Sequence, residues 1–144
     1  MKFVPAAVYL DTSIWRDYFE DRRDGLRPLG EFAFRFLKEC AEKGFDVIVS
    51  DTVTLELGLR FSESQIPEVF SAFKGSIRFI DATSEALAEA KHEWAARERN
   101  LPFNDVLHAV LAKRNGAVLI ARDRHFEALS EIVKICKPEE FIFR

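Results

Sequence analysis

Four carboxylates in this sequence of 144 residues are candidates for shared chemistry: Asp11, Glu56, Asp105 and Asp123. If they converge, the arrangement is one that folding alone would avoid, because two like charges about 4 Å apart repel by about 4 kcal/mol at an effective dielectric constant near 20. A cation would offset that repulsion, and sites rich in oxygen suit Mg²⁺ or Mn²⁺. A metal ion in such a site activates water and supports in-line displacement at phosphorus. The four acids therefore suggest metal-dependent phosphoryl chemistry.

Each acid also has a purely structural interpretation. Asp11 is a good helix N-cap, and Asp105 suits the first turn of a helix, where it favours the helix dipole. Glu56 has the character of an ordinary exposed helix residue. Asp123 is able to cap the turn at His125. The residue types alone leave both interpretations open for each acid.

Strand patterns alternate with helical patterns along the chain, which predicts βαβ units and a parallel sheet. Strands are expected at residues 6–10, 45–49, 77–80, 117–121 and 133–136. Helical patterns are expected at 14–20, 29–43, from 52 onward, 66–73, 84–99 and from 104 to about 115, with a last turn at 138–141. No repeat, low-complexity segment or linker divides the sequence, so we expect one domain over residues 1–144.

This organisation suggests how the acids could meet. Asp11 and Asp123 each follow the carboxyl end of a strand. If the first and fourth strands are neighbours at a topological switch point, these two acids share one crevice. Glu56 enters from the helix after the second strand, and Asp105 from a helix for which Asn104 is the expected N-cap.

Composition narrows the class of protein. The chain is 48% hydrophobic and 31% charged, with a net charge of −3 that argues mildly against a nucleic-acid binder. Cys40 and Cys136 lack metal-ligand spacing and are expected to be buried thiols. The N-terminus is a poor signal peptide and no apolar run could span a membrane, so we expect a cytoplasmic protein. Phe34 lies off the apolar face of its helix and suggests a partner or homodimer surface.

Four segments carry a family resemblance when they are taken in order. They are Leu-Asp-Thr-Ser-Ile-Trp at 10–15, Ser-Asp-Thr-Val-Thr-Leu-Glu-Leu at 50–57, Leu-Pro-Phe-Asn-Asp-Val-Leu-His-Ala at 101–109 and Ala-Arg-Asp-Arg-His-Phe at 121–126. With these segments the chain resembles PIN-domain proteins, and among them the ribonuclease toxins of VapC type. The match spans almost the whole sequence.

The resemblance implies a three-layer α/β fold with a five-stranded parallel sheet in the order 3-2-1-4-5. It implies a metal-dependent endoribonuclease that cleaves RNA with Mg²⁺ or Mn²⁺, and possession of an antitoxin partner if the chain is a toxin. Asp11, Asp105 and Asp123 would ligate the metal, and Glu56 would complete the acidic site. Thr12 or Ser13 would hydrogen-bond around Asp11.

The sequence departs from the family pattern at two positions. Ala121 stands where many members have a hydroxyl residue that would orient a ligand. His125 stands where some members have a further acid, which makes a site with one metal plausible. His92, His108 and His125 are not spaced as a metal-binding set. His108 lies one turn after Asp105, which leaves a place near the site open for it, but a lone helical histidine is more often structural.

Other functions remain open at this stage. A catalytically silent PIN-like module for RNA binding or assembly is the main alternative, although all four acids are present. A phosphohydrolase of haloacid-dehalogenase type needs a second aspartate at the position of Ser13. A Rossmann dehydrogenase needs a glycine-rich turn, which the sequence lacks.

Overall fold

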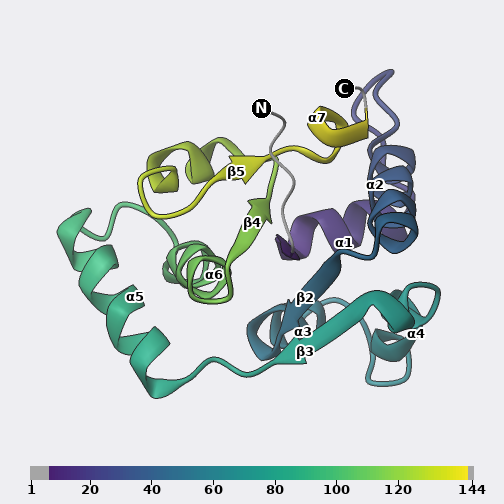
Figure 1. The fold of residues 1–144 in the computed structure, drawn as a ribbon. Coiled ribbons are helices and arrows are strands. Elements are labelled where there is room, and N and C mark those ends of the chain that lie inside the picture. The colour runs from purple at the N-terminus through teal and green to yellow at the C-terminus, as the bar shows by residue number, and fades with distance from the viewer. Residues whose placement is uncertain (1–6, 143–144) are drawn as a thin grey trace.

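The computed structural model describes residues 7–142 and has a parallel β-sheet at its centre (Figure 1). The strands stand in the order β3-β2-β1-β4-β5, and each neighbouring pair is parallel. Their bounds are β1 Ala7–Leu10, β2 Asp46–Ser50, β3 Ile77–Ile80, β4 Ala117–Ile120 and β5 Ile135–Cys136. The predicted strand order is confirmed, and it places β1 beside β4.

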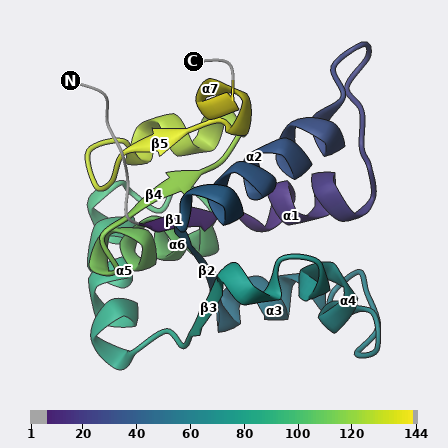
Figure 2. The same ribbon diagram turned by 45° about the vertical axis from the view of Figure 1, so that its right-hand side comes forward.

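Helices cover both faces of this sheet. Their bounds are α1 Thr12–Phe19, α2 Leu29–Lys43, α3 Asp51–Leu57, α4 Ile66–Ser71, α5 Ser84–Ala96, α6 Phe103–Arg114 and α7 Pro138–Ile142, with short 3₁₀ turns at η1 Lys74–Ser76 and η2 Arg124–Leu129. Helix α1 packs on α2, α2 on α7, and α5 on α6. Figures 1 and 2 show α5 and α6 on one side of the sheet and α1 and α2 on the other, which makes the predicted α/β sandwich of three layers. Across residues 7–142, no helix is both long and apolar enough to cross a membrane.

The central strands are buried because helices cover both of their faces. All residues of β1 (Ala-Val-Tyr-Leu) and of β4 (Ala-Val-Leu-Ile) are buried, as expected of inner strands in a covered parallel sheet. The core around them includes Trp15 and Phe36. This packing gives the carboxyl ends of β1 and β4 a rigid base.

Strand β5 and helix α5 are each shorter than the sequence pattern predicts. Strand β5 was expected to begin at Val133, but the Val133 N–H bonds to Leu129 O and closes a turn, so the strand begins at Ile135. Helix α5 was expected to reach Arg99, but it ends at Ala96, and Arg99 adopts a left-handed conformation with φ of 56°. In both places the backbone forms a turn where the apolar pattern predicts that the strand or helix continues.

Two predictions about single side chains also concern the fold. Cys40 and Cys136 are buried and form no disulfide within the described residues, as expected. Phe34 is 44% exposed on α2 and stacks on the ring of Tyr18 in α1. It is therefore part of an aromatic surface rather than an isolated exposed ring.

Candidate functional site

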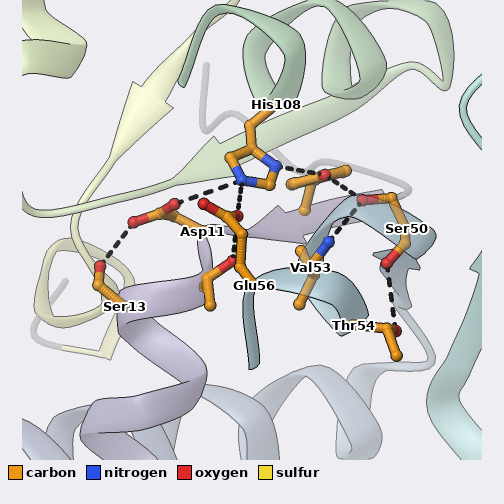
Figure 3. Close-up of polar contacts among 9 residues, drawn as sticks. Asp11, Ser13, Ser50, Val53, Thr54, Glu56 and His108 are labelled. Carbon is orange, nitrogen blue, oxygen red and sulfur yellow. Dashed lines mark hydrogen bonds and ion pairs between the residues drawn. The ribbon is translucent and has the colours of Figure 1, made fainter. Parts of the chain in front are cut away.

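Asp11 lies where β1 passes into α1, at the carboxyl edge of the sheet. Its N–H donates to Ile120 O at 2.9 Å, which fixes it beside the end of β4. It occupies the N-cap position of α1 but makes no capping hydrogen bond with its side chain. Its Oδ2 instead accepts a hydrogen bond from Ser13 Oγ at 2.6 Å (Figure 3). Helix capping therefore does not explain this buried aspartate.

Glu56 is half-buried on α3 and faces the same place (Figure 3). Its Oε1 accepts hydrogen bonds from Thr12 Oγ1 at 2.7 Å and from His108 Nε2 at 2.5 Å. Asn104 supplies a further side-chain hydrogen bond. Burial would raise the pKa of Glu56, but the hydrogen bonds from His108 and Thr12 lower it below its usual value. Glu56 is thus held as an ionised carboxylate, not as a free surface residue.

His108 lies on α6, and its side chain is fully buried between the acids and the sheet. Its Nε2 is 3.9 Å from Asp11 Oδ1, and its Nδ1 is 2.6 Å from Tyr9 Oη. Burial would lower the pKa of His108, but the hydrogen bond to Glu56 and the charge of Asp11 raise it above its usual value. The structure therefore brings a histidine into direct contact with the acidic cluster.

Asp105 lies in the first turn of the same helix, one turn before His108. Burial raises the pKa of Asp105 to about 6, and the negative charges of Asp11 and Glu56 raise it as well, while His108 acts in the opposite direction. These interactions place Asp105 within electrostatic reach of both other acids. Asp105 is therefore harder to ionise than a free aspartate, because it is partly buried and lies near the charges of Asp11 and Glu56.

Asp123 follows β4, but its environment differs from that of the other three acids. Its side chain is 54% exposed, accepts the N–H of His125 at 3.1 Å and lies 3.4 Å from His125 Nε2. It caps the η2 turn, which is the structural role that the sequence allowed. Within residues 7–142, its hydrogen bond and ion pair are with His125 and not with the residues around Asp11.

The structure thus brings Asp11, Glu56 and Asp105 together and leaves Asp123 on an exposed turn at the same sheet edge. Ser13 hydrogen-bonds Asp11 as the resemblance implied, whereas Thr12 serves Glu56. The two departures from the family pattern lie nearby. Ala121 is buried with its N–H on Cys136 O, and His125 is half-exposed.

Two residues near the acids were misjudged from sequence. Asn104 was expected to cap α6, but the helix begins at Phe103 with Pro102 in the N-cap position, and the Asn104 side chain bonds Glu56 instead. For His108 the sequence favoured a structural role over a place near the site. The available signal was spacing, because residues i, i+3 and i+4 of a helix share one face, as Asp105 and Asn104 do with His108.

The chemistry of these side chains suits a divalent metal, but their spacing in this structure suits it less well. Carboxylate oxygens are the donors that Mg²⁺ and Mn²⁺ prefer, and a cation would relieve the repulsion that raises the pKa of Asp105. In the part of the chain that the structure describes, however, no three His, Cys, Asp or Glu side chains are grouped closely enough to hold a metal ion. Asp11, Glu56 and Asp105 are the residues that would hold one after a local adjustment.

Two solved structures resemble this chain in fold. The first is VapBC2 from Rickettsia felis, bound to a DNA fragment from their promoter; the match has a TM-score of 0.69 and 17% sequence identity, and covers 91% of this chain and 98% of that one. The second is FitAcB from Neisseria gonorrhoeae, with a TM-score of 0.63, 18% identity and coverage of 92% and 98%. No curated protein is a significant match by sequence.

The family assignment comes from the sequence as a whole. A family model described as the PIN domain matches residues 8–132, which include all four predicted site acids. That range runs from β1 into the segment just before β5. The chain therefore belongs to the PIN domain family, whose members are generally nucleases.

Proposed function

We propose that this protein is an endoribonuclease that depends on a divalent metal, Mg²⁺ or Mn²⁺, and cleaves phosphodiester bonds of RNA. The observation that carries the proposal is the shared environment of Asp11, Glu56 and Asp105 at the carboxyl edge of a PIN-domain sheet. Ligands of open parallel sheets bind at this edge. Buried acids that repel one another there favour a cationic cofactor over a purely structural role.

The side chains would divide the work as follows. Asp11, Glu56 and Asp105 would hold the cation, with Asp123 reaching it from the turn after β4. Ser13 and Thr12 keep two of these carboxylates oriented through their hydroxyl groups. When bound, the metal supplies an activated water and neutralises charge at the scissile phosphate. The fully buried base of the site excludes water from one side of the reacting group.

The proposal is tested by incubating the protein with a pool of RNA of mixed sequence in Mn²⁺ or Mg²⁺ and, in parallel, in EDTA. Cleavage should occur only with metal and should be lost in Asp105→Asn. Asp46→Asn is the matched control, because Asp46 is an exposed aspartate at the opposite end of β2 and should leave cleavage unchanged. Cleavage that persists in EDTA or in Asp105→Asn would rule out the proposed site.

A catalytically silent module that binds RNA is the second candidate, and one observation favours it. Asp123 is exposed and tied to His125, and the described residues include no preformed group of three metal donors. RNA binding without cleavage, together with the absence of any Mn²⁺-induced rise in melting temperature, would favour this alternative.

We further propose an antitoxin partner and a homodimer for this protein, acting in the cytoplasm. Support comes from the two structural relatives, one of which is the VapBC2 complex, and from apolar side chains left exposed on the surface. These side chains are Leu26, Phe34, Leu55, Leu59 and Phe79. A partner protein would cover such a surface, and co-expression with the product of a neighbouring gene tests for it.

A further inference from the structure

A chain of buried hydrogen bonds runs from Glu56 back into the sheet (Figure 3). Glu56 Oε1 lies 2.5 Å from His108 Nε2, and His108 Nδ1 lies 2.6 Å from Tyr9 Oη. Tyr9 Oη in turn lies 2.6 Å from Ser50 Oγ, which accepts the N–H of Val53 at 3.3 Å. The chain connects α3, α6, β1 and β2 through side chains that are far apart in sequence.

The chemistry of the two ends sets the direction of these hydrogen bonds. An ionised carboxylate only accepts, so His108 Nε2 must donate to Glu56 whether or not the ring carries a second proton. In the neutral ring Nδ1 accepts from Tyr9, and Ser50 donates to Tyr9; in the protonated ring Nδ1–H donates to Tyr9, and Tyr9 donates to Ser50. Val53 N–H donates to Ser50 in both cases. The hydrogen bond from Nε2 to Glu56 keeps its direction in either form of the ring.

The side chains of this chain of hydrogen bonds are buried, and this burial restricts how they can be oriented. His108 and Tyr9 are inaccessible to solvent, and Ser50 is almost so. A buried polar group left without its partner costs about 1–3 kcal/mol, so no member of the chain is free to turn away from the next. The imidazole is therefore locked with Nε2 towards Glu56, which is itself one of the acids of the site.

We propose that His108 is a positioning residue for the metal site: its Nε2–H, oriented from behind by Tyr9 and Ser50, holds the Glu56 carboxylate towards Asp11 and Asp105. The inference rests on the proposed function, because it concerns the same three acids. It assigns His108 no contact with the metal or the RNA. Its effect passes through Glu56, as a partner of a metal-ligating side chain commonly acts.

Three variants separate this role from simple core packing. His108→Leu removes the donor, and it should weaken Mn²⁺ binding and kcat by about 10–100-fold, the usual range for lost support of a metal ligand. His108→Gln keeps an N–H donor near the Nε2 position, and it should recover most of the Mn²⁺ affinity. Val110→Ala is the matched control, because it deletes buried volume on the same helix without touching a hydrogen bond. It should lower the melting temperature and leave Mn²⁺ affinity unchanged.

Mn²⁺ affinity is measured by calorimetry well below the melting temperatures, and kcat and KM for RNA are measured separately. Loss of affinity in His108→Leu with recovery in His108→Gln supports the proposal. Equal affinity in wild type and all three variants overturns it, and so does equal loss in His108→Gln and His108→Leu. Wild-type protein that binds no Mn²⁺ overturns the proposed function itself, which distinguishes the two failures.

Two further measurements keep the test decisive if His108→Leu does not fold. Tyr9→Phe deletes only the hydroxyl that orients the ring, and it should weaken Mn²⁺ binding in the same direction. In the NMR spectrum of the metal-free wild type, the His108 Nε2–H should appear as an imidazole proton in slow exchange with solvent. Its absence, or an unchanged Mn²⁺ affinity in Tyr9→Phe, counts against the positioning role.

Discussion

At the scale of single residues, two neighbouring hydroxyls at the start of α1 serve different carboxylates. Thr12 donates to Glu56, which is 44 residues away in sequence, and Ser13 donates to Asp11, two residues before it. Successive residues of a helix point in different directions, so one turn can support two acids at once. Hydroxyl support of this kind lowers the cost of holding ionised carboxylates close together. It does not remove the repulsion between the carboxylates themselves.

The burial of Asp105 and this repulsion together predict a gain in stability when Asp105 loses its charge. The pKa of Asp105 is raised to about 6 in the folded chain, above its value of roughly 4 in an unfolded chain, so ionisation at pH 7 opposes folding. In EDTA, Asp105→Asn should therefore raise the free energy of unfolding by about 1 kcal/mol, after a discount for the partial exposure of the side chain. Urea denaturation at pH 7 measures the change.

The same experiment has an internal check in its pH dependence. As pH falls from about 7 to about 4, wild-type Asp105 takes up its proton and the advantage of Asp105→Asn should disappear. Asp46→Asn, at an exposed position, should stay within about 0.5 kcal/mol of wild type. An Asp105→Asn protein that is less stable than wild type at pH 7 in EDTA would show that the acids do not repel one another.

At the scale of elements, an arginine after β4 ties the edge of the site to two helices. Arg122 donates from Nη1 and Nη2 to the carboxylate of Glu139 in α7, at 2.6 and 2.9 Å. Its Nε lies 3.8 Å from Oδ2 of Asp17 in α1, a buried acid that Arg22 also contacts. We call these contacts of Arg122 with Glu139 and Asp17 the arginine clamp. Arg122 immediately precedes Asp123, so the clamp fixes where the turn that carries Asp123 leaves the sheet.

The clamp predicts a dependence of stability on pH. Burial would raise the pKa of Glu139, but the two hydrogen bonds from Arg122 lower it below its usual value. A lowered carboxyl pKa stabilises the fold above roughly pH 4.3, the unfolded value, and this contribution is lost as pH falls through the folded value. Glu139→Gln should be less stable than wild type by about 1 kcal/mol at pH 7, and this difference should shrink as pH falls below about 4.3.

Thermal melts of both proteins between pH 3 and pH 7 check this expectation. Glu140→Gln on the same helix serves as the comparison, because the Glu140 carboxylate accepts the N–H of Lys137 at 3.1 Å. A difference between Glu139→Gln and wild type that stayed constant with pH would mean that packing, and not the ion pair, is what the substitution changes.

At this same scale the sequence predicts the fold well and the site only in part. The local alternation of strands and helices, together with the family resemblance, is enough to predict that β1 lies beside β4 and that Asp11 lies at their shared edge. Contacts between distant side chains are not encoded in local patterns. His108 hydrogen-bonds Tyr9, 99 residues away in sequence, and Glu56, 52 residues away. In the sequence of its own helix it is only a single histidine among apolar residues, and that pattern does not indicate either partner. Asn104 was misassigned because a good N-cap residue is equally good as a hydrogen-bond donor inside the first turn.

At the scale of the whole molecule, most arginines near the surface are already paired with acids. The paired arginines are Arg16 (with Glu20), Arg22 (Asp17), Arg27 (Asp24), Arg60 (Glu20), Arg78 (Asp46), Arg97 (Glu93), Arg114 (Glu89) and Arg122 (Glu139). Basic residues lie close together in the sequence at 22 and 23, 97 and 99, 113 and 114, and 122 and 124, and at least one residue of each of these four pairs takes part in an ion pair. With a net charge of −3, the chain has no large basic field to attract RNA over a distance.

Binding of RNA should therefore depend weakly on salt. Each phosphate neutralised on a single strand contributes about −0.7 to the slope of log K against log salt, so two to four contacts give a slope of roughly −1.4 to −2.8. Filter binding of a short RNA to Asp105→Asn in EDTA, between low and moderate salt, measures this slope without cleavage. Arg124→Ala removes an arginine next to Asp123, and it should make the slope shallower by about 0.7. Arg27→Ala removes an exposed arginine that is already paired with Asp24, and it should leave the slope unchanged. A slope steeper than about −5 would mean that the paired arginines release their acids to bind RNA, and that the charge balance of the free chain does not describe the complex.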